Sequence, residues 1–221
     1  MSRRPLYFEV AERVRELIYR GMLKPGEWID EIALSKQFGI SRTPLREALK
    51  VLHAENLIEL VARKGCRVNE LDDDELLELF PVMASLEGLC ADLATQRLKP
   101  SDMKRLERIH ERLESQAMAN NVDGYYETNR EFHRAIQNLT GNRWLTRVTD
   151  ELRNVMVLAR HRQLTVEGRL QESLEEHRKI IQALRVGDAE AASKAMFNHL
   201  CQQERVLKED HKIPQNEAAQ G

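Results

Sequence analysis

Residues 34–52 read Leu34-Ser-Lys-Gln-Phe-Gly-Ile-Ser-Arg-Thr-Pro-Leu-Arg-Glu-Ala-Leu-Lys-Val-Leu52, and this stretch decides the fold of the first part of the chain. A short helix is predicted before the glycine, with Asp30 as its N-cap. Gly39 can end that helix in the left-handed conformation, which costs glycine nothing because it has no Cβ atom. Ser41 or Thr43 can then cap a second helix. The stretch therefore predicts two helices joined by a tight turn.

The second helix has one apolar and one basic side. Its predicted buried face repeats at helical spacing and consists of Leu45, Ala48, Leu49 and Leu52. Arg42, Arg46 and Lys50 are left to point outward. This pattern is typical of a helix-turn-helix, whose second helix enters the DNA major groove, where a guanidinium fork can bind guanine or phosphate. Two helices and a turn also occur in proteins that never bind DNA, so the flanking sequence has to decide.

A basic hairpin is predicted after the second helix. Residues 57–61 and 66–68 are typical of short strands, and Arg63, Lys64 and Gly65 lie in the turn between them. A basic hairpin in this place indicates a wing, which holds the sugar-phosphate backbone or the minor groove of DNA. A helix before the pair is also predicted, with an apolar side made of Val10, Val14, Leu17 and Ile18.

Residues 7–69 resemble the winged-helix domain of the GntR family of bacterial transcription regulators. The segments that carry the resemblance are residues 21–26 (GMLKPG), 31–34 (EIAL), 39–49 (GISRTPLREAL), 55–57 (ENL) and 63–65 (RKG). The resemblance implies that Arg42, Thr43 and Arg46 contact DNA and that the wing around Gly65 reaches a neighbouring groove. Members often have an arginine where this chain has Ile32, which predicts a different operator from the best-known sites.

The distribution of charge agrees with a DNA-binding first domain. The formal net charge of the chain is −2, which by itself argues against a nucleic-acid-binding protein. Residues 1–70, however, hold 13 Lys and Arg against 10 Asp and Glu, whereas the rest of the chain holds 21 against 26. The basic excess thus coincides with the predicted winged helix, as attraction to phosphates requires.

The cysteine spacing and the hydropathy of the sequence argue against a disulfide-stabilised protein and against a membrane protein. Cys66, Cys90 and Cys201 are widely separated and odd in number, which argues against a disulfide framework and against a thiolate zinc site. No apolar run is long enough to cross a membrane, and no secretory signal opens the sequence. We therefore expect a cytoplasmic protein that has no membrane partner.

The remainder of the chain is predicted to be a helical bundle. After an acidic linker at residues 71–75, which follows a DNA-binding domain at residues 1–70, an all-helical domain is expected at residues 76–212. Its helices are predicted at residues 76–94, 100–119, 123–139, from 144 past 158, 170–186 and 189–208. A kink or break is expected at Pro81. Residues 213–221 are expected to be a disordered tail.

Three histidines lie on the apolar faces of three of these helices. They are His133, His177 and His199, and Asn129 lies one turn before the first. A single histidine on such a face is more often a core residue with a hydrogen-bond partner. Three buried imidazoles cost polar desolvation unless each is paired, and a shared metal is one way to satisfy them all. Imidazole nitrogen suits zinc, nickel and similar ions.

Residues 76–208 resemble the helical ligand-binding domain of the FadR-type branch of the GntR family. The similar segments are residues 129–133 (NREFH), 140–142 (TGN), 176–178 (EHR), 187–189 (GDA) and 198–200 (NHL). Many members bind a divalent metal through three histidines and an aspartate four residues before the first. The resemblance thus implies His133, His177 and His199 as ligands, with Asn129 in the aspartate position. Asparagine brings no charge, which predicts a lower affinity or a different ion.

Relatives with this site use the metal to hold the carboxylate of a small organic acid. They often have an arginine where this chain has Met83, so one carboxylate contact is expected to be missing. Arg153, Arg160 and Arg162 are candidate substitutes, although each is also explained as a solvated surface charge.

The leading interpretation is a ligand-responsive, DNA-binding transcription regulator and not an enzyme. Effector binding to the helical domain would change how a homodimer spans a palindromic operator. One alternative is a metal-dependent hydrolase or lyase with an accessory nucleic-acid domain. This alternative lacks a convincing general base. Glu131 and Glu176 lie near the proposed ligands in the sequence, but side chains of adjacent residues on a helix point in different directions. A second alternative is a regulator whose metal is purely structural.

Overall fold

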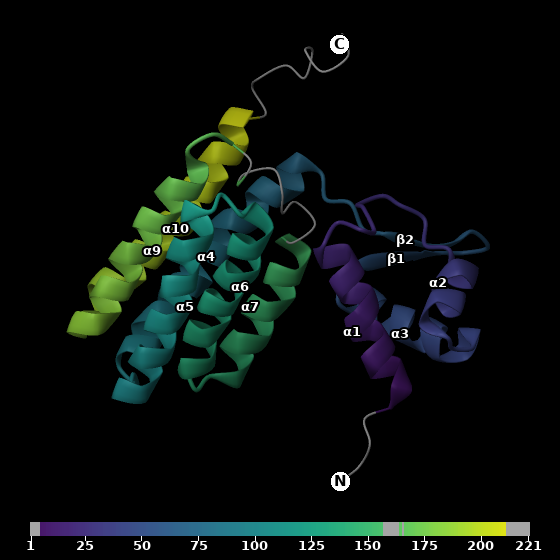
Figure 1. Ribbon diagram of the computed structural model, residues 1–221, viewed down its shortest axis with the longest axis horizontal. Coiled ribbons are helices and arrows are strands. Elements are labelled where there is room, and N and C mark those ends of the chain that lie inside the picture. Colours follow the sequence, from purple (N-terminus) through teal and green to yellow (C-terminus); the bar gives the residue numbers. More distant parts are fainter. Residues whose placement is uncertain (1–4, 157–163, 165, 211–221) are drawn as a thin grey trace. The chain divides into compact units, whose positions relative to one another are not determined.

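The computed structural model describes residues 5–156, 164 and 166–210. Within these residues the contacts form two compact units, one made of residues 5–73 with 151–156 and the other of residues 74–150 with 164 and 166–210. Helices and a single two-stranded hairpin make up the regular structure of the described chain (Figure 1). The mainly α fold predicted from the sequence is confirmed.

The first unit contains three helices and the hairpin. In chain order they are α1 (Leu6–Tyr19), α2 (Glu31–Phe38), α3 (Arg42–Ala54), β1 (Ile58–Val61) and β2 (Gly65–Val68). The Asp30 side chain caps α2 as predicted, because it accepts hydrogen bonds from the backbone N–H groups of Ile32 and Ala33 at 2.8 and 3.0 Å. Gly39 ends α2 with a φ of 66°, in the left-handed region. Ser41 occupies the N-cap of α3, without a capping hydrogen bond from its side chain.

The hairpin is antiparallel and starts one residue later than predicted. Its register pairs Ile58 with Val68 and Val61 with Gly65. Leu57 lies outside β1 because the preceding residue, Asn56, has a φ of 57° and the N–H of Leu57 donates to the carbonyl of Leu52. The N–H of Ile29 donates to the Cys66 carbonyl, which fastens the hairpin to the start of α2.

The core of the first unit lies where α1 packs on α3. The buried side chains come from both helices, from the hairpin and from the residue before it: Val10, Val14, Ile18, Leu45, Ala48, Leu49, Leu52, Leu57, Ile58, Cys66 and Val68. At the edge of this core the Arg15 guanidinium donates two hydrogen bonds to the Glu55 carboxylate from Nη2, at 2.7 and 2.8 Å, and one from Nε at 3.0 Å. This packing fixes which side of α3 faces solvent.

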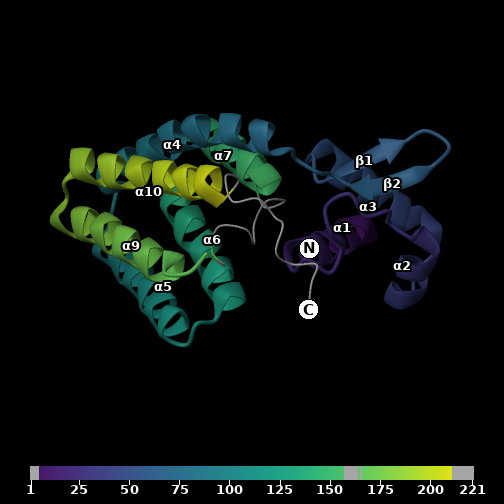
Figure 2. The same cartoon turned by 90° about the horizontal axis from the view of Figure 1, so that it is seen from above.

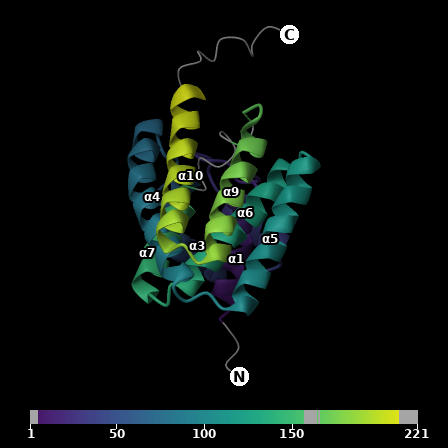
Figure 3. The ribbon, with the colours of Figure 1, turned by 90° about the vertical axis from the view of Figure 1, so that its left-hand side faces the viewer.

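The second unit is a bundle of long helices. They are α4 (Asp73–Thr95), α5 (Pro100–Met118), α6 (Val122–Leu139), α7 (Arg143–Met156), α9 (Arg169–Val186) and α10 (Ala189–Asp210). The first residue of α4 and the last six residues of α7, 151–156, are grouped with the first unit. Helix α9 lies between α10 and α5 (Figure 3), and α5 also packs on α6. Helix α4 runs along α10 (Figure 2), where Gly88 approaches the backbone of Ser193 closely: a Cβ atom at Gly88 would lie 3.2 Å from the Ser193 carbonyl oxygen.

Helix α4 corrects the predicted linker boundary and rules out a break at Pro81, one of the two outcomes predicted there. It begins at Asp73, inside the predicted linker at residues 71–75, and it continues through Pro81 without a break. A proline inside a helix costs about 3 kcal/mol. The ring is exposed, and burial of Leu76, Phe80, Met83 and Ala84 on the other side of the helix offsets that cost.

The other helix boundaries are close to those predicted. Helix α6 is capped by Asn121, which accepts a hydrogen bond from the N–H of Gly124 at 3.0 Å, and Asp123 lies within the first turn. The predicted continuation of the fourth bundle helix past residue 158, and the predicted disordered tail at residues 213–221, lie outside the described residues.

Candidate DNA-binding face and metal centre

The solvent side of α3 carries the basic residues predicted to contact DNA. Arg42, Thr43, Arg46 and Lys50 are all exposed. The Nε atom of Arg46 donates to Oε2 of Glu31 on α2 at 2.8 Å, and Nζ of Lys50 donates to Oε1 of Glu47 at 2.8 Å. The contact with Glu31 raises the pKa of the Arg46 guanidinium, so the group keeps its charge. Because Nε is engaged, the two terminal nitrogens form the edge that can address a base or a phosphate.

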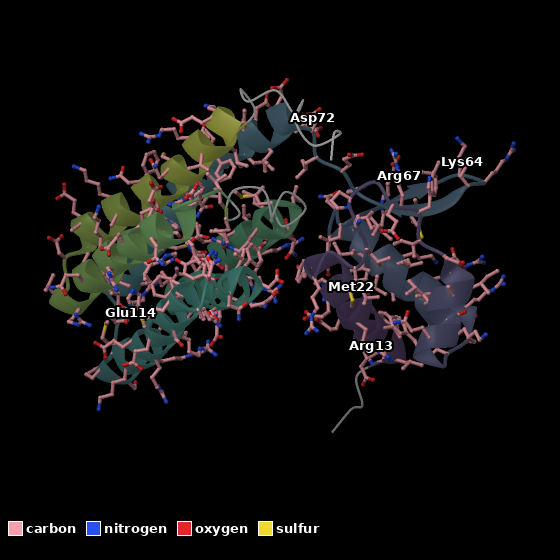
Figure 4. The ribbon with its side chains drawn as sticks, turned by 45° about the horizontal axis from the view of Figure 1, so that its top comes forward. Arg13, Met22, Lys64, Arg67, Asp72 and Glu114 are labelled. Atoms are coloured by element: carbon pink, nitrogen blue, oxygen red, sulfur yellow. The ribbon has the colours of Figure 1, made fainter. Side chains whose placement is uncertain are left out.

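The wing presents a second basic surface in the same unit. Arg63 and Lys64 are exposed in the turn between β1 and β2, and the exposed Gly65 is the first residue of β2. Gly65 has a φ of 113°, which side chains rarely adopt, so glycine is required there. Lys64 lies at the outer end of the hairpin, and Arg67 follows on β2 (Figure 4). Arg67 forms a cross-strand ion pair with Glu59 at 2.7 Å.

Ile32 is an exposed apolar residue on α2. It is 61% exposed and directly follows Glu31, the residue that holds Arg46. An aliphatic side chain cannot make the hydrogen bonds of an arginine, and its favourable contact in the major groove is with a thymine methyl group. The expected departure in operator preference therefore stays a prediction.

The three predicted histidines meet inside the second unit. His133 on α6, His177 on α9 and His199 on α10 are fully buried, and one ring nitrogen of each lies within 4.8 Å of one ring nitrogen of each of the others. The ring centroids of His177 and His199 are 4.5 Å apart, and those of His133 and His199 are 5.3 Å apart and stacked. The structure therefore brings together the residues that the sequence placed on separate helices.

Each imidazole has its own hydrogen-bond acceptor at Nδ1. His133 Nδ1 lies 3.1 Å from Oε2 of Glu87, His177 Nδ1 lies 2.7 Å from the Ser173 carbonyl oxygen, and His199 Nδ1 lies 2.5 Å from Oε2 of Glu176. Such contacts place the proton on Nδ1 and the lone pair on Nε2. The arrangement thus leaves the three Nε2 atoms as the ones a shared cation would use.

The two carboxylates that contact the imidazoles are themselves held by hydrogen bonds. Gln137 donates to the other oxygen of Glu87 at 2.7 Å, and the Arg169 guanidinium binds Glu176 through both terminal nitrogens at 2.8 and 2.9 Å. Burial by itself raises the pKa of the Glu176 carboxyl, but hydrogen bonds from His199 and Arg169 bring it below the usual value. Glu176 therefore remains an ionised acceptor.

Buried atoms of His177 and of Asn129, one turn before His133, are not satisfied by the protein. Nε2 of His177 and Oδ1 of Asn129 have no hydrogen-bond partner among the described residues. Burial, followed by the neighbouring imidazoles of His199 and His133, holds the pKa of His177 well below 6.5, so this ring is neutral. A neutral imidazole nitrogen and an amide oxygen are both competent metal ligands. The donor set therefore fits a divalent cation.

Two family models match the chain. One is described as "Bacterial regulatory proteins, gntR family" and matches residues 6–68, and the other is the FCD domain and matches residues 78–202. The chain belongs to the GntR family. It combines a GntR DNA-binding domain with an FCD domain, as the resemblance in its sequence implied.

Individual relatives of this GntR-family chain are transcription regulators. It is 28% identical over 213 residues to the uncharacterized HTH-type transcriptional regulator YdhC of Bacillus subtilis, which covers 94% of this chain and 95% of that protein. It is 30% identical over 208 residues to a probable D-xylose utilization operon transcriptional repressor of Paenarthrobacter nicotinovorans, covering 90% of this chain and 89% of that one. The structure of Escherichia coli McbR/YncC shares the fold with a TM-score of 0.85 at 24% identity, over 94% of this chain and 99% of that one.

These matches identify the GntR-family chain as a DNA-binding transcription regulator and confirm that it is not an enzyme. The geometry also opposes the hydrolase or lyase alternative. Glu131 is exposed and forms an ion pair with Arg112, while Glu176 is held by Arg169 and His199. Neither carboxylate is placed as a general base.

Among the described helices, none is long and apolar enough to cross a membrane.

Sequence reasoning missed the residues that support the imidazoles. Glu87, Ser173 and Gln203 were not singled out, and Glu176 was considered only as a catalytic base. Of the three arginines proposed to bind an effector in this GntR-family chain, Arg153 is half-buried on α7, and Arg160 and Arg162 lie outside the described residues. Met83, which replaces a common arginine, is fully buried.

Proposed function

We propose that this regulator binds a divalent metal, zinc or nickel, at His133, His177, His199 and Asn129, and that the metal anchors the carboxylate of a small organic acid. Binding of this effector would change the affinity of a homodimer for a palindromic operator in the cytoplasm. The observation that carries the proposal is that the three buried imidazoles meet in one cluster and that Nδ1 of each faces its own hydrogen-bond acceptor.

The chemistry of the cluster supports a cation more than a simple hydrogen-bonded core. Three buried imidazoles that only filled space would be expected to donate to one another or to the backbone. Here two of them contact carboxylates, Glu87 and Glu176, which strengthens imidazole as a ligand. The unsatisfied Nε2 of His177 and Oδ1 of Asn129 cost free energy in a dry interior unless a ligand meets them. A metal would satisfy both atoms at once.

Asn129 gives the proposed site a different charge from one that contains an aspartate. All four proposed protein ligands are neutral, so they leave the double positive charge of the ion to be balanced by Glu87, Glu176 and a bound anion. A cation in such a site attracts an anionic ligand strongly. This supports a carboxylate effector, although Met83 removes one expected arginine.

The DNA-binding part of the proposal rests on exposed residues of the first unit, most of which are arginine or lysine. Arg42, Thr43, Arg46 and Lys50 would enter the major groove from α3, and Arg63, Lys64 and Gly65 would contact the backbone or an adjacent groove. Two copies of the unit are needed to read both halves of a palindrome. The coupling between effector and operator is reciprocal, so DNA must change effector affinity by the same factor.

A direct test begins with duplexes selected from a random DNA library for binding to the metal-loaded protein. The selected operator is then titrated with the metal-loaded and chelator-stripped protein, with and without a panel of small organic acids. The proposal predicts that at least one acid changes operator affinity only when the metal is present. If no acid changes the affinity and the metal only raises the unfolding temperature, the metal is structural. If removal of the metal changes neither the operator affinity nor the unfolding temperature, the proposed site is wrong.

A further inference from the structure

Gln203 lies at the edge of the histidine cluster, where no role has been assigned to it. It is on α10, one turn after His199, and is only 9% exposed. Its amide nitrogen is 2.7 Å from Nε2 of His199. The side chain therefore reaches the same ring nitrogen that the proposed metal site requires.

The hydrogen bonds of His199 show which atom donates. Nδ1 of His199 faces the Glu176 carboxylate at 2.5 Å, and Glu176 is fixed by Arg169, so Nδ1 carries the proton. Nε2 then has a lone pair, and the Gln203 amide N–H donates to it. A cation bound to His199 needs that same lone pair. The amide group cannot keep this hydrogen bond when a cation arrives.

A half-turn of the amide group resolves the conflict. The oxygen and nitrogen of a glutamine amide exchange places by rotation about the last side-chain bond, at little steric cost because the two ends have nearly the same size. A cation repels the NH2 end and attracts the carbonyl oxygen. The present separation of 2.7 Å is also close to the spacing of neighbouring ligands at right angles, about 3 Å for bonds of about 2.1 Å.

We propose that Gln203 is a metal ligand of this chain, binding through Oε1 after its amide turns away from hydrogen bonding with His199. The inference rests on the metal site proposed above. It adds a second amide oxygen to that of Asn129, so that three imidazoles and two neutral oxygens surround the ion. Five protein ligands favour an ion that accepts six ligands, such as nickel, over zinc, which is usually four-coordinate. One position remains for the effector carboxylate.

The test measures nickel affinity of the chelator-stripped full-length protein by competition with a chromophoric chelator. Gln203→Leu removes the amide at nearly constant volume and should weaken nickel binding by about tenfold or more. Gln202→Leu, the same change at the preceding residue, is the matched control and should leave the affinity unchanged. Gln203→Glu supplies a charged oxygen and should bind nickel at least as tightly as the parent protein.

Cobalt provides an independent readout of ligand number. The parent protein loaded with Co²⁺ should show the weak visible absorption of a five- or six-coordinate ion, and Gln203→Leu should change the spectrum. Unchanged affinity and spectrum in Gln203→Leu would overturn the assignment, and tighter binding would show that Gln203 only competes with the metal. If Gln203→Leu does not fold, the Gln203→Glu variant provides the test. Nickel binding by Gln203→Glu that is weaker than that of the parent protein would overturn the assignment of Gln203 as a ligand.

The outcomes separate this inference from the proposed function. If the parent protein binds neither nickel nor cobalt, the metal site itself is wrong and the inference falls with it. If the parent binds nickel and His177→Ala abolishes binding, but Gln203→Leu behaves like the parent, the metal site stands and only the role of Gln203 is refuted.

Discussion

Glu87 and His133 are both fully buried, and Oε2 of the carboxylate lies 3.1 Å from Nδ1 of the imidazole. Leaving a carboxylate in the interior is costly unless it is hydrogen-bonded, and the second oxygen of Glu87 accepts from Gln137 at 2.7 Å. The pair orients His133 in the cluster, where one of its ring nitrogens lies within 4.8 Å of ring nitrogens of His177 and His199. Glu87 is thus a positioning residue for the proposed metal centre.

Replacing Glu87 with glutamine keeps the size of the side chain but places a neutral amide against His133. We expect metal affinity to fall by about 10- to 100-fold, because the charged carboxylate that accepts from Nδ1 is replaced by a neutral amide oxygen, which makes the imidazole a weaker metal ligand. The measurement is competition with a chelator on the stripped protein. Glu78→Gln, an exposed position on the same helix, is the control, and equal affinities for the two variants would contradict the role of Glu87.

Arg46→Ala should weaken binding to the selected operator by about 1–3 kcal/mol and relax the preference at the bases it reads. Arg20→Ala removes the same charge from another exposed arginine of the first unit, which pairs with Glu16 as Arg46 pairs with Glu31. It should have the smaller effect. Equal losses of operator affinity for the two variants would mean that binding depends only on the total charge of the unit and not on the position of Arg46. Fluorescence anisotropy with operator and scrambled duplexes distinguishes these results.

The helix-turn-helix could be predicted because its determinants are local. Asp30 caps α2 and Gly39 ends it within one short stretch, and the alternation of Leu45 and Leu49 with Arg46 and Lys50 assigns the two sides of α3. Each signal acts over a few residues, so no long-range contact was needed to read it.

The histidines of the second unit could also be predicted, but their supporting residues could not. Helical spacing shows that His133, His177 and His199 face inward, whereas Glu87 lies 46 positions before His133 in sequence. A glutamate in an amphipathic helix is normally solvated, and sequence alone does not show when a distant helix covers it. Pro81 illustrates the same limit, since tertiary packing outweighed its local preference to interrupt the helix.

Asp30→Ala should lower the free energy of unfolding by about 1 kcal/mol, because the two backbone N–H groups of α2 lose their acceptor. Ser41→Ala changes the N-cap of the next helix, where the side chain makes no capping hydrogen bond, and should have a smaller effect. Urea unfolding of both variants measures the difference. A larger loss for Ser41→Ala would contradict this assignment of the caps.

His110 should make stability depend on pH. Burial is the main cause that lowers the pKa of this imidazole below 6.5 in the folded protein. The unfolded chain therefore binds the proton more readily, and the stability contributed by the neutral ring is present above pH 6.5 and is lost as the pH falls below it. His110→Gln should flatten the dependence of the unfolding free energy between about pH 7 and about pH 5. Parallel curves for parent and variant would contradict this.

The central claim is that the three imidazoles bind one metal ion per chain. It is tested most directly by isothermal titration calorimetry of the chelator-stripped protein with nickel and with zinc, beside a His177→Ala variant whose helical content is confirmed by circular dichroism. The account predicts one tightly bound ion per chain in the parent protein and none in the variant. A parent protein that takes up neither ion, or a variant that binds as the parent does, would contradict it.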